Sequence, residues 1–200
     1  MKRTLVDVVK ALALAGVFFF VVQAVLQNYQ VLGESMEPNL HSGQHVIVNK
    51  AAYMSLDVDR LSKFIPFYDA DEGSELHLFG EPQRGDVVVV VSPQPPGNRL
   101  VKRIVGLPGD SLEIEAGMLK INGHTVSEPY VLGRARNRGP TTIPADHYFV
   151  LGDNRPQSND SNNFGPVHES RIIGKAWLAY WPPENFGTVD SFTMEPGTEE

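Results

Sequence analysis

The sequence contains no cysteine among its 200 residues. A cysteine nucleophile, a disulfide framework and the cysteine-rich zinc and iron–sulfur sites are therefore excluded. Positive charge is also scarce, because 17 Lys and Arg stand against 24 Asp and Glu, for a formal net charge of -7. A nucleic-acid partner calls for a basic surface, so we expect none. No internal repeat is visible, and the length suits one globular domain with an additional short segment.

One apolar run is long enough to cross a bilayer. Residues 8–27 read VVKALALAGVFFFVVQAVLQ, with Lys10 as the only charge. Twenty helical residues span about 30 Å, the thickness of the hydrocarbon core. A cleaved signal peptide would end in small residues, but VLQNY follows here. A helix buried in a protein core is seldom apolar around its whole circumference. We therefore predict an uncleaved transmembrane anchor over residues 8–27.

Basic residues indicate how this anchor is oriented. Lys2, Arg3 and Lys10 lie at its amino-terminal end. By the positive-inside rule, residues 1–7 stay in the cytoplasm and the chain from residue 28 lies outside it. The sequence thus predicts a single-pass protein of the cell membrane, with lipid as one partner.

Beyond the anchor the pattern is that of short strands. The 15 Pro and 18 Gly favour frequent turns. The run of Val at residues 87–91 is apolar on both faces, which predicts a fully buried strand. Pro108 and Gly109 fit the centre of a type II turn, and Asn122 and Gly123 fit a tight turn between strands. We predict a mainly β domain over residues 28–182, with further strands at residues 45–48, 100–105, 112–115, 118–121, 147–151 and 172–181.

Two segments do not fit the strand pattern. Residues 57–80 form an irregular insertion that contains Phe-Ile-Pro-Phe-Tyr at residues 64–68. This insertion is either a lid or membrane-dipping loop, or an ordinary surface insertion with its aromatic side chains tucked inward. Residues 183–200 end in EPGTEE, and we predict that they are disordered.

Ser35 is a candidate nucleophile because it lies between a glycine and a proline, about eight residues after the anchor. A serine hydroxyl needs a proton acceptor before it attacks an amide. None of the six histidines lies in a G-x-S-x-G or other local triad pattern. His41 and His45 have helical spacing, but Gly43 disfavours a helix and no H-E-x-x-H is present, so we predict no metal site.

Lys102 is a second candidate for the base. On a strand over residues 100–105 it shares a face with Leu100 and Ile104, while Arg103 faces away. An ammonium on an apolar face is desolvated, which lowers its pKa and favours the neutral amine that can accept a proton. Alternatively, Lys102 extends to the sheet edge as a solubilising charge.

A polar segment at residues 151–165 reads LGDNRPQSNDSNNFG. Its short hydrogen-bonding side chains are typical of a loop built from Asx and Ser turns. The same side chains could orient a catalytic lysine, as a third group orients the base of a triad.

Four segments, in this order, resemble the sequence boxes of type I signal peptidases, serine proteases that remove signal peptides from exported proteins. They are residues 35–40 (SMEPNL), 84–89 (RGDVVV), 102–110 (KRIVGLPGD) and 152–165. With the anchor, the resemblance runs from about residue 5 to 181. It implies a signal-peptidase-like β domain and a serine endopeptidase of precursor proteins that needs no cofactor or metal.

The resemblance also assigns roles to individual residues. Ser35 is the nucleophile, Lys102 the general base, and Ser158 the group that hydrogen-bonds and orients the lysine amine. Two residues of the Ser35 segment are expected to contact substrate, Met36 and Pro38. The shape of the site would be held by Asp153, Arg155, Asp160 and Ser161, and Gly33 is a further supporting residue.

The sequence departs from the family pattern at three positions. Asn39 replaces a usual Thr, and Asn162 replaces an Arg that commonly pairs with the nearby Asp160. Gly33 stands where some members carry a hydroxyl that assists the oxyanion hole, so backbone N–H groups such as that of Ser35 would stabilise the oxyanion. Two alternatives stay open, a self-cleaving Ser–Lys peptidase and a membrane-tethered β domain that binds partners without chemistry.

Overall fold

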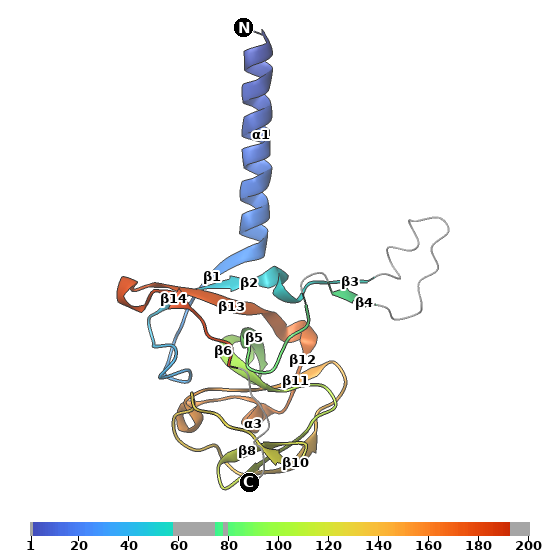
Figure 1. Ribbon diagram of the computed structural model, residues 1–200, viewed down its shortest axis with the longest axis vertical. Coiled ribbons are helices and arrows are strands. Elements are labelled where there is room, and N and C mark those ends of the chain that lie inside the picture. Colours follow the sequence, from blue (N-terminus) through green and yellow to red (C-terminus); the bar gives the residue numbers. More distant parts are fainter. Residues whose placement is uncertain (1, 58–74, 78–79, 193–200) are drawn as a thin grey trace, which may run out of the picture.

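The computed structural model of the chain describes residues 2–57, 75–77 and 80–192. Its first element is a helix, α1 (Lys2–Val25), which stands clear of the β-rich remainder (Figure 1). Residues 26 and 27, which the sequence placed in the anchor, already belong to β1 (Leu26–Gln30). The helix therefore passes into the β domain without a loop, because β1 pairs with β2 (His45–Asn49) from its first residue.

One antiparallel sheet forms the body of the domain. Its strand order is β1-β2-β13-β5-β6-β11-β12, and β14 pairs with β13. In the described part of the chain β1 pairs only with β2, which leaves its other edge open. The remaining strands are β5 (Val87–Pro93), β6 (Pro96–Gly106), β11 (His147–Leu151), β12 (Val167–His168), β13 (Ile172–Trp181) and β14 (Gly187–Thr188).

A four-stranded sheet, in the order β10-β7-β8-β9, lies at the end of the domain away from α1 (Figure 1). The predicted turns occur here: Gly109 has φ +85°, and Asn122 and Gly123 both have positive φ. The Asp110 N–H donates to the Leu107 carbonyl at 3.1 Å and closes the first of these turns. The strands are β7 (Ser111–Glu115), β8 (Met118–Ile121), β9 (His124–Thr125) and β10 (Arg138–Thr142).

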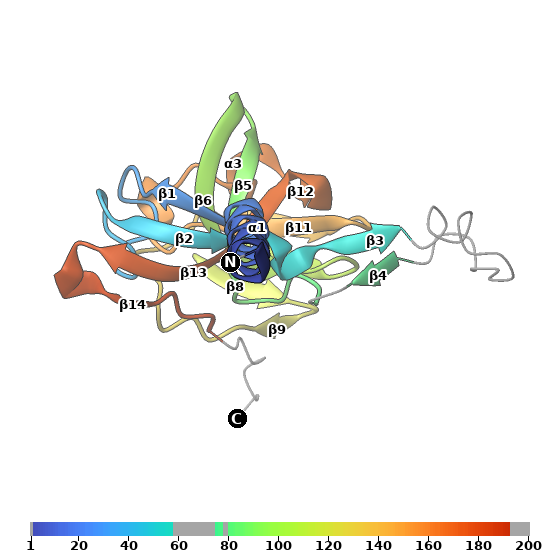
Figure 2. The same ribbon diagram turned by 90° about the horizontal axis from the view of Figure 1, so that it is seen from above.

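Short helical turns connect these strands. They are η1 (Lys50–Tyr53), η2 (Arg155–Gln157), α3 (Ser161–Phe164), η3 (Glu169–Arg171) and η4 (Pro183–Asn185). A separate pair of strands, β3 (Ser55–Asp57) and β4 (Glu75–His77), protrudes sideways from the domain (Figure 2). The aromatic segment at residues 64–68 lies outside the described residues, so the interpretation of this insertion stays a prediction.

The strand β5 separates two hydrophobic clusters, as its continuous run of Val predicts. Val87 and Val89 belong to a cluster with Met36 and Val46, whereas Val88 and Val90 belong to one on the opposite face of the sheet. A third cluster, which includes Leu112, Ile114, Leu119 and Phe149, fills the space under the smaller sheet. We call the three clusters, in this order, the upper, the middle and the lower cluster.

The chain after residue 182 differs from the sequence-based expectation. Residues 183–192 are ordered: η4 is followed by β14, which pairs with β13, and Phe192 stacks on Tyr130 with ring centroids 4.9 Å apart. The acidic, proline-containing composition favours disorder only where no partner surface is available. Here β13 and Tyr130 supply such surfaces. Residues 193–200 lie outside the described part, and their predicted disorder stays a prediction.

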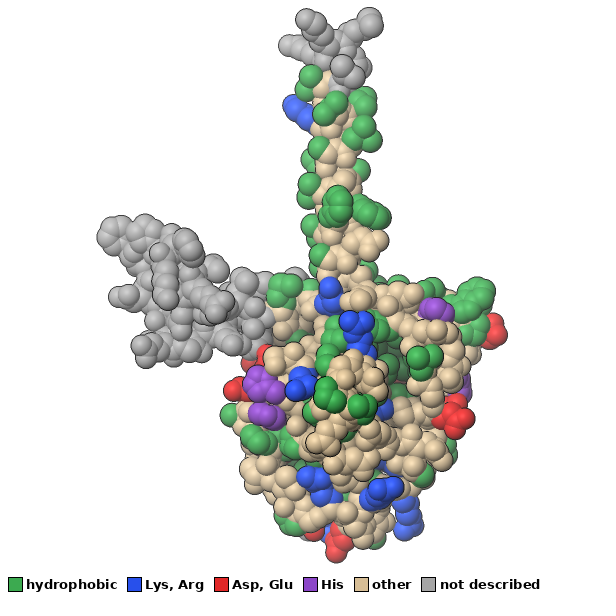
Figure 3. All heavy atoms as spheres, turned by 180° about the vertical axis from the view of Figure 1, so that it is seen from behind, with side chains coloured by type: hydrophobic (Ala, Val, Ile, Leu, Met, Phe, Trp, Pro, Cys, Tyr) green, Lys and Arg blue, Asp and Glu red, His purple; other side chains and the backbone are tan. Residues whose placement is uncertain are grey.

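The surface of α1 contrasts with that of the domain. The window Val6–Val25 has a mean hydropathy of 2.3, and none of it is buried. Figure 3 shows hydrophobic side chains along the helix, while Lys, Arg, Asp and Glu side chains are spread over the face of the domain. The helix is long and apolar enough to cross a membrane, which is consistent with a membrane-anchored protein.

Candidate active site

The loop that carries Ser35 joins β1 to β2 and is fastened at both ends. The Val31 N–H donates to the Gln44 carbonyl at 2.8 Å, and the Gly43 N–H donates to the Val31 carbonyl at 2.8 Å. Within the loop, the side chain of Met36 is buried in the upper cluster. Since its neighbour is anchored in the core, the partly exposed Ser35 is held at one position on the surface.

Met36 and Pro38, the two expected substrate contacts, have different environments. Met36 is 1% exposed, so in this structure it presents no surface to a peptide, in contrast to the expectation. A large apolar side chain next to the nucleophile gains more from burial in the core than from a place in an open site. Pro38 is exposed, and its contact with substrate stays a prediction.

Lys102 projects from the middle of β6, where it pairs in register with Val88 of β5. Its side chain is 2% exposed, so it is no solubilising charge at the sheet edge. The flanking residues on the same face, Leu100 and Ile104, belong to the middle cluster, as strand alternation predicts. The Nζ atom lies 2.6 Å from Oγ of Ser35, 67 residues away in the sequence.

Burial changes the acidity of this lysine. Desolvation lowers the pKa of the Lys102 amine from 10.5 to about 8, even though the nearby carboxylates of Asp160 and Asp153 act in the opposite direction. A surface lysine is almost wholly protonated near neutral pH, whereas an amine of this pKa has a substantial neutral fraction. The side chain can therefore accept a proton from a hydroxyl beside it.

A buried ion pair lies under the Ser35 loop. Arg103, on the face of β6 opposite Lys102, binds Asp153 with two parallel hydrogen bonds, Nε to Oδ1 at 2.9 Å and Nη2 to Oδ2 at 2.7 Å. The side chains of both residues are 1% exposed. Asn39 of the loop donates from Nδ2 to the same Asp153 carboxylate at 2.8 Å and to the Tyr130 carbonyl at 3.0 Å. The pair thus holds the loop in place.

Arg155 shapes the site through a second buried pair. Its guanidinium binds both carboxylate oxygens of Glu128, at 3.0 and 2.6 Å, and donates from Nε to the Gly152 carbonyl at 3.0 Å. Glu128 also accepts a hydrogen bond from the hydroxyl of Tyr130 at 2.8 Å. The expected structural role of Arg155 is consistent with these contacts.

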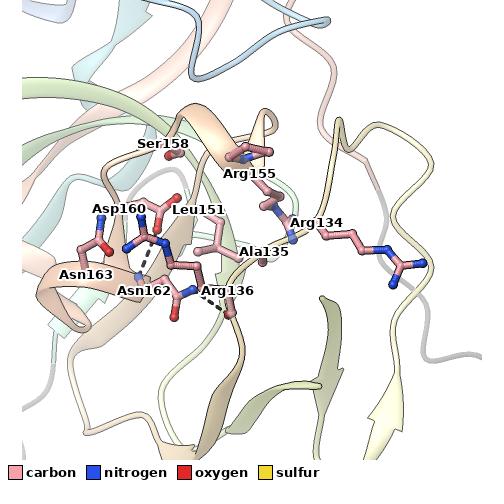
Figure 4. A pocket seen from close by; sticks show the side chains of 10 residues that line it. Arg134, Ala135, Arg136, Leu151, Arg155, Ser158, Asp160, Asn162 and Asn163 are labelled. Carbon is pink, nitrogen blue, oxygen red and sulfur yellow. Dashed lines mark hydrogen bonds between the residues drawn. The ribbon is translucent and has the colours of Figure 1, made fainter. Parts of the chain in front are cut away.

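Asp160 and Ser161 bind backbone groups of the strand that leads into the site. Asp160 accepts from the Gly152 N–H at 3.0 Å and caps α3 by accepting from the Asn162 N–H, also at 3.0 Å. Ser161 accepts from the Val150 N–H at 3.0 Å. Figure 4 shows the side chain of Arg136 extending toward Asp160 and Asn162. Two backbone N–H donors therefore bind the Asp160 carboxylate, one at each oxygen.

Ser158 lies beside Gly152, next to the backbone of Ser35, but does not make the expected hydrogen bond to Lys102. Its Oγ is buried and has no hydrogen-bond partner among the described residues. A Cβ on Gly152 would meet this Oγ at 2.3 Å and the Ser35 carbonyl oxygen at 2.5 Å, so only glycine fits there. The Asn154 N–H donates to the same Ser35 carbonyl at 3.0 Å, which ties the polar segment to the nucleophile loop.

Gly33 begins the nucleophile loop with a φ of +84°, a conformation that glycine adopts without strain. It has no side chain to place in an oxyanion hole. Its N–H donates to Oγ of Ser42 at 3.2 Å, which closes the loop across its base. Gly33 thus shapes the start of the loop and offers no side-chain donor beside Ser35.

A groove of about 550 Å³ runs beside the loop. It is lined by Tyr29 and Gln30 of the open-edged strand β1, by Leu32, and by residues 97–101 of β6 together with Val89. Arg99 spans it, with its guanidinium carbon 5.7 Å from the centre of the Tyr29 ring. The groove thus lies along the unpaired edge of β1, whose last residue, Gln30, is five positions before Ser35.

Sequence reasoning missed three residues that complete the site: Asn39 as a link to Asp153, Arg103 as its ion-pair partner, and Glu128 as the partner of Arg155. The sequence does indicate that Arg103 is buried, because strand alternation puts it on an interior face of the sheet. A buried charge needs a partner. Glu128 lies in the connection between β9 and β10, where no strand periodicity predicts the direction of its side chain. No three His, Cys, Asp or Glu side chains gather into a possible metal site within the described ranges.

A serine hydroxyl at hydrogen-bond distance from a buried lysine amine, on a β domain beside a groove with an open strand edge, defines a serine hydrolase. Comparison with known proteins specifies this class further. The chain matches the family described as "Signal peptidase, peptidase S26" over residues 2–181.

The chain is also similar to individual signal peptidases. Signal peptidase I of Bacillus licheniformis is 31% identical over 194 residues, which cover 90% of this chain and 91% of the relative. Signal peptidase IB of Staphylococcus aureus is 30% identical over 206 residues, covering 93% and 94%. A crystal structure of a signal peptidase I from Enterococcus faecalis V583 is 36% identical, with a TM-score of 0.42, and covers 48% of this chain and 97% of that one.

The chain therefore belongs to the signal peptidase family, peptidase S26, and is a serine endopeptidase. The assignment rests on the family match and on the sequence relatives, which extend over most of the chain. It decides against a binding module without chemistry, and it confirms the resemblance that the four ordered segments indicate.

Proposed function

We propose that this endopeptidase cleaves N-terminal signal peptides from exported precursor proteins, with Ser35 as nucleophile and Lys102 as general base. The observation that carries the proposal is the distance of 2.6 Å between Lys102 Nζ and Ser35 Oγ in a buried environment. The names of the relatives support the substrate class.

The reaction has two stages. Ser35 Oγ attacks the carbonyl carbon of the scissile bond while its proton passes to the neutral Lys102 amine. The tetrahedral intermediate then expels the amine of the mature protein, which takes the proton from the Lys102 ammonium, and an acyl-enzyme ester remains. In the second stage Lys102 takes a proton from water, the hydroxide attacks the ester, and Ser35 regains its proton as the signal-peptide carboxylate leaves.

Two further groups act on this cycle. The Ser35 N–H would donate to the developing oxyanion, a type of interaction whose loss costs about 3–4 kcal/mol. The buried Ser158 hydroxyl, which has no hydrogen-bond partner among the described residues, would bind the Lys102 amine once that amine has turned from Ser35 during proton transfer. Its position beside Gly152 and the Ser35 carbonyl supports this role.

The substrate would bind in the groove as an extended strand. An added strand can pair with the open edge of β1, and its alternate side chains then point into the groove. The family resemblance implies pockets that accept only small residues at the first and third positions before the cut.

The helix α1 would hold the active site at the membrane. Lys10 and the basic residues before it orient the amino terminus toward the cytoplasm, which places the β domain on the extracytoplasmic side. Enzyme and precursor then share one membrane surface, and this raises their effective concentration. The proposal thus includes membrane lipid as a partner of α1.

Cleavage of a precursor by the purified full-length protein tests the proposed function. Wild-type protein should release the mature chain at the expected junction, and Ser35→Ala protein, with an unchanged circular dichroism spectrum, should release none. Cleavage at full rate by Ser35→Ala would overturn the assignment of the nucleophile.

A further inference from the structure

Residues 187–192 follow β13 and lie beyond the segment, residues 2–181, that matches the family. We call them the C-terminal strap. In Figure 1 this dark red chain leaves β14 and descends toward β5 and β6. The sequence comparison assigns it no role, yet the strap contacts three parts of the domain that are distant in the sequence.

The strap packs against two of the three hydrophobic clusters. Val189 donates its N–H to the Trp177 carbonyl at 2.9 Å, and its side chain lies against the upper cluster. Phe192 lies against the lower cluster and stacks on Tyr130 with an interplanar angle of 21°. The strap therefore bridges the large sheet and the smaller one.

Between these two anchors the strap covers Arg103. The guanidinium carbon of Arg103 lies 4.5 Å from the centre of the Tyr130 ring and 5.0 Å from that of Phe192, so each ring contributes a cation–π contact. Nη1 donates to the carbonyl of Asp190 at 2.9 Å and to that of Gly85 at 2.7 Å. The strap thus supplies one of the acceptors that a buried guanidinium requires.

The fit of the strap against the β5 side is tight. A Cβ on Gly85 would meet the carbonyl oxygen of Phe192 at 1.9 Å, so any larger residue at position 85 would displace the strap. Gly85 also has a φ of +95°. Glycine at this position therefore meets two requirements, a backbone conformation and a close approach.

The covered ion pair leads directly to the nucleophile. Arg103 holds the Asp153 carboxylate, that carboxylate accepts from Asn39, and Asn39 belongs to the loop that carries Ser35. Without the strap, water would reach the pair and one Nη1 hydrogen would lose its acceptor. The position of Asp153, and with it the position of the loop, would then be less sharply defined.

We propose that the C-terminal strap is a positioning element of the active site: by sealing the Arg103–Asp153 pair, it holds the Ser35 loop opposite Lys102. The proposal rests on the proposed function for its kinetic consequences. The strap itself touches none of the reacting groups, so its removal should lower kcat and leave KM nearly unchanged.

Two truncations of the full-length protein provide the main test. A chain that ends at Thr188 lacks the contacts of Asp190 and Phe192, whereas a chain that ends at Phe192 keeps every one of them. On a signal-peptide substrate the shorter chain should show a kcat lower by about tenfold or more, with KM within about twofold of wild type. The longer chain should match wild type. Equal kcat for the two chains would overturn the proposal.

Point variants keep the test valid if the shorter chain folds poorly. Phe192→Ala should lower kcat, Phe192→Tyr should restore it, and the control Phe186→Ala, at a side chain 67% exposed in the same tail, should have no effect. A loss in Phe192→Ala that Phe192→Tyr fails to restore would contradict the stacking on which the seal depends.

Gly85→Ala tests the close approach itself. In the full chain it should lower kcat by more than about fivefold, whereas in the chain ending at Thr188 the clash is absent and only the conformational cost remains, so the loss there should be smaller by about twofold or more. Gly123→Ala has a similar φ of +87° and no atom within 4 Å, so it measures the conformational cost alone. Equal Gly85→Ala effects in the two chains would overturn the proposal.

Hydrogen exchange separates this inference from the proposed function, since it needs no substrate. The chain ending at Thr188 should exchange faster at the amides of Leu40 and Asn154, which bond within and to the Ser35 loop. Unchanged exchange would refute the strap as a positioning element. A wild-type protein that cleaves no precursor but shows this difference would instead refute the proposed function alone.

Discussion

In the proposed mechanism Lys102 is the side chain that accepts and returns the protons. It is buried on an apolar face, its pKa is lowered to about 8, and its nitrogen lies 2.6 Å from the Ser35 oxygen. A lysine in solvent would meet none of these three conditions, because its amine would be exposed, protonated and free to move.

Lys102→Ala and Lys102→Arg should each lower the rate of precursor cleavage by roughly 10³-fold or more. Alanine removes the proton acceptor, and arginine keeps a charge that it does not lose in this pH range. Rates of single-turnover cleavage by purified full-length protein measure the effect, with circular dichroism as the control for folding. Full activity in Lys102→Ala would contradict the assignment of Lys102 as general base and make a histidine the candidate instead.

The cleavage rate should depend on pH in a definite direction. Only the neutral Lys102 amine accepts the Ser35 proton, so kcat/KM rises with pH and levels off above a pH of about 8. Below that value the rise should approach about tenfold per pH unit. Measurement of kcat/KM between acidic and alkaline pH checks this. A midpoint near the ordinary histidine pKa of about 6.5 would contradict the assignment.

The burial of the Lys102 ammonium should also lower the free energy of unfolding. Below pH 8 the folded state holds a buried ammonium, and the difference between 10.5 and about 8 corresponds to roughly 3 kcal/mol of lost stability. Lys102→Met should therefore raise the free energy of unfolding at pH 7 by an amount of this order. The gain should shrink as pH rises from 8 to 10.5, because the folded lysine is then neutral while the unfolded lysine still binds its proton, so the wild-type protein gains stability with pH. Denaturant unfolding at several pH values measures it.

At the scale of elements, the loop between β1 and β2 becomes rigid by contacts from outside itself. Met36 anchors it in the upper cluster, Asn154 binds the Ser35 carbonyl, and Asn39 binds the buried Asp153. The β6 strand then supplies Lys102 from the opposite side. A loop with one core anchor and two hydrogen bonds to a polar segment is preorganised, which is what attack by a hydroxyl requires.

Asn39→Asp should lower kcat by about 10²-fold, because a second carboxylate would face Asp153 where an amide now donates at 2.8 Å. Asn39→Thr keeps a donor, and it should cost about fivefold or less, the worth of about one ordinary hydrogen bond. Steady-state kinetics of both variants on one signal-peptide substrate compare them. A larger loss in Asn39→Thr than in Asn39→Asp would rule out this electrostatic explanation.

At the scale of the whole molecule, the apolar helix and the catalytic domain are joined without a linker. The helix ends at Val25 and β1 starts at Leu26, so the open edge of the sheet lies directly beside the helix end. This connection keeps the groove and Ser35 at a defined height from the proposed membrane surface.

Removal of residues 2–25 should affect cleavage of a membrane-bound substrate much more than cleavage of a soluble one. Cleavage of a short soluble peptide should stay within about threefold of wild type, since the helix contributes nothing to the site. Cleavage of a precursor embedded in lipid vesicles should fall by about tenfold or more, because the shared surface is lost. Parallel assays of both substrates measure the two rates. A similar loss on both would show that the helix acts on the fold of the domain.

Local patterns in the sequence were sufficient for much of this structure. The apolar run predicts α1, the Val run predicts the buried β5, and Pro108-Gly109 and Asn122-Gly123 predict the turns that the structure contains. These features depend on period, propensity and turn chemistry over a few residues. The prediction of disorder from residue 183 was wrong as far as residue 192. Composition alone does not show that this segment pairs with β13 and stacks on Tyr130.

Local sequence patterns were enough to place Ser35 near an apolar segment and Lys102 on an apolar strand face. No local pattern indicates that their atoms meet, that Ser158 lacks its expected bond to Lys102 here, or that Arg103, Asp153 and Asn39 form one network; these follow from packing. The physical reason is that a strand's periodicity states which way a side chain points but not what lies opposite. That partner is chosen by the packing of segments up to 114 residues apart in the chain.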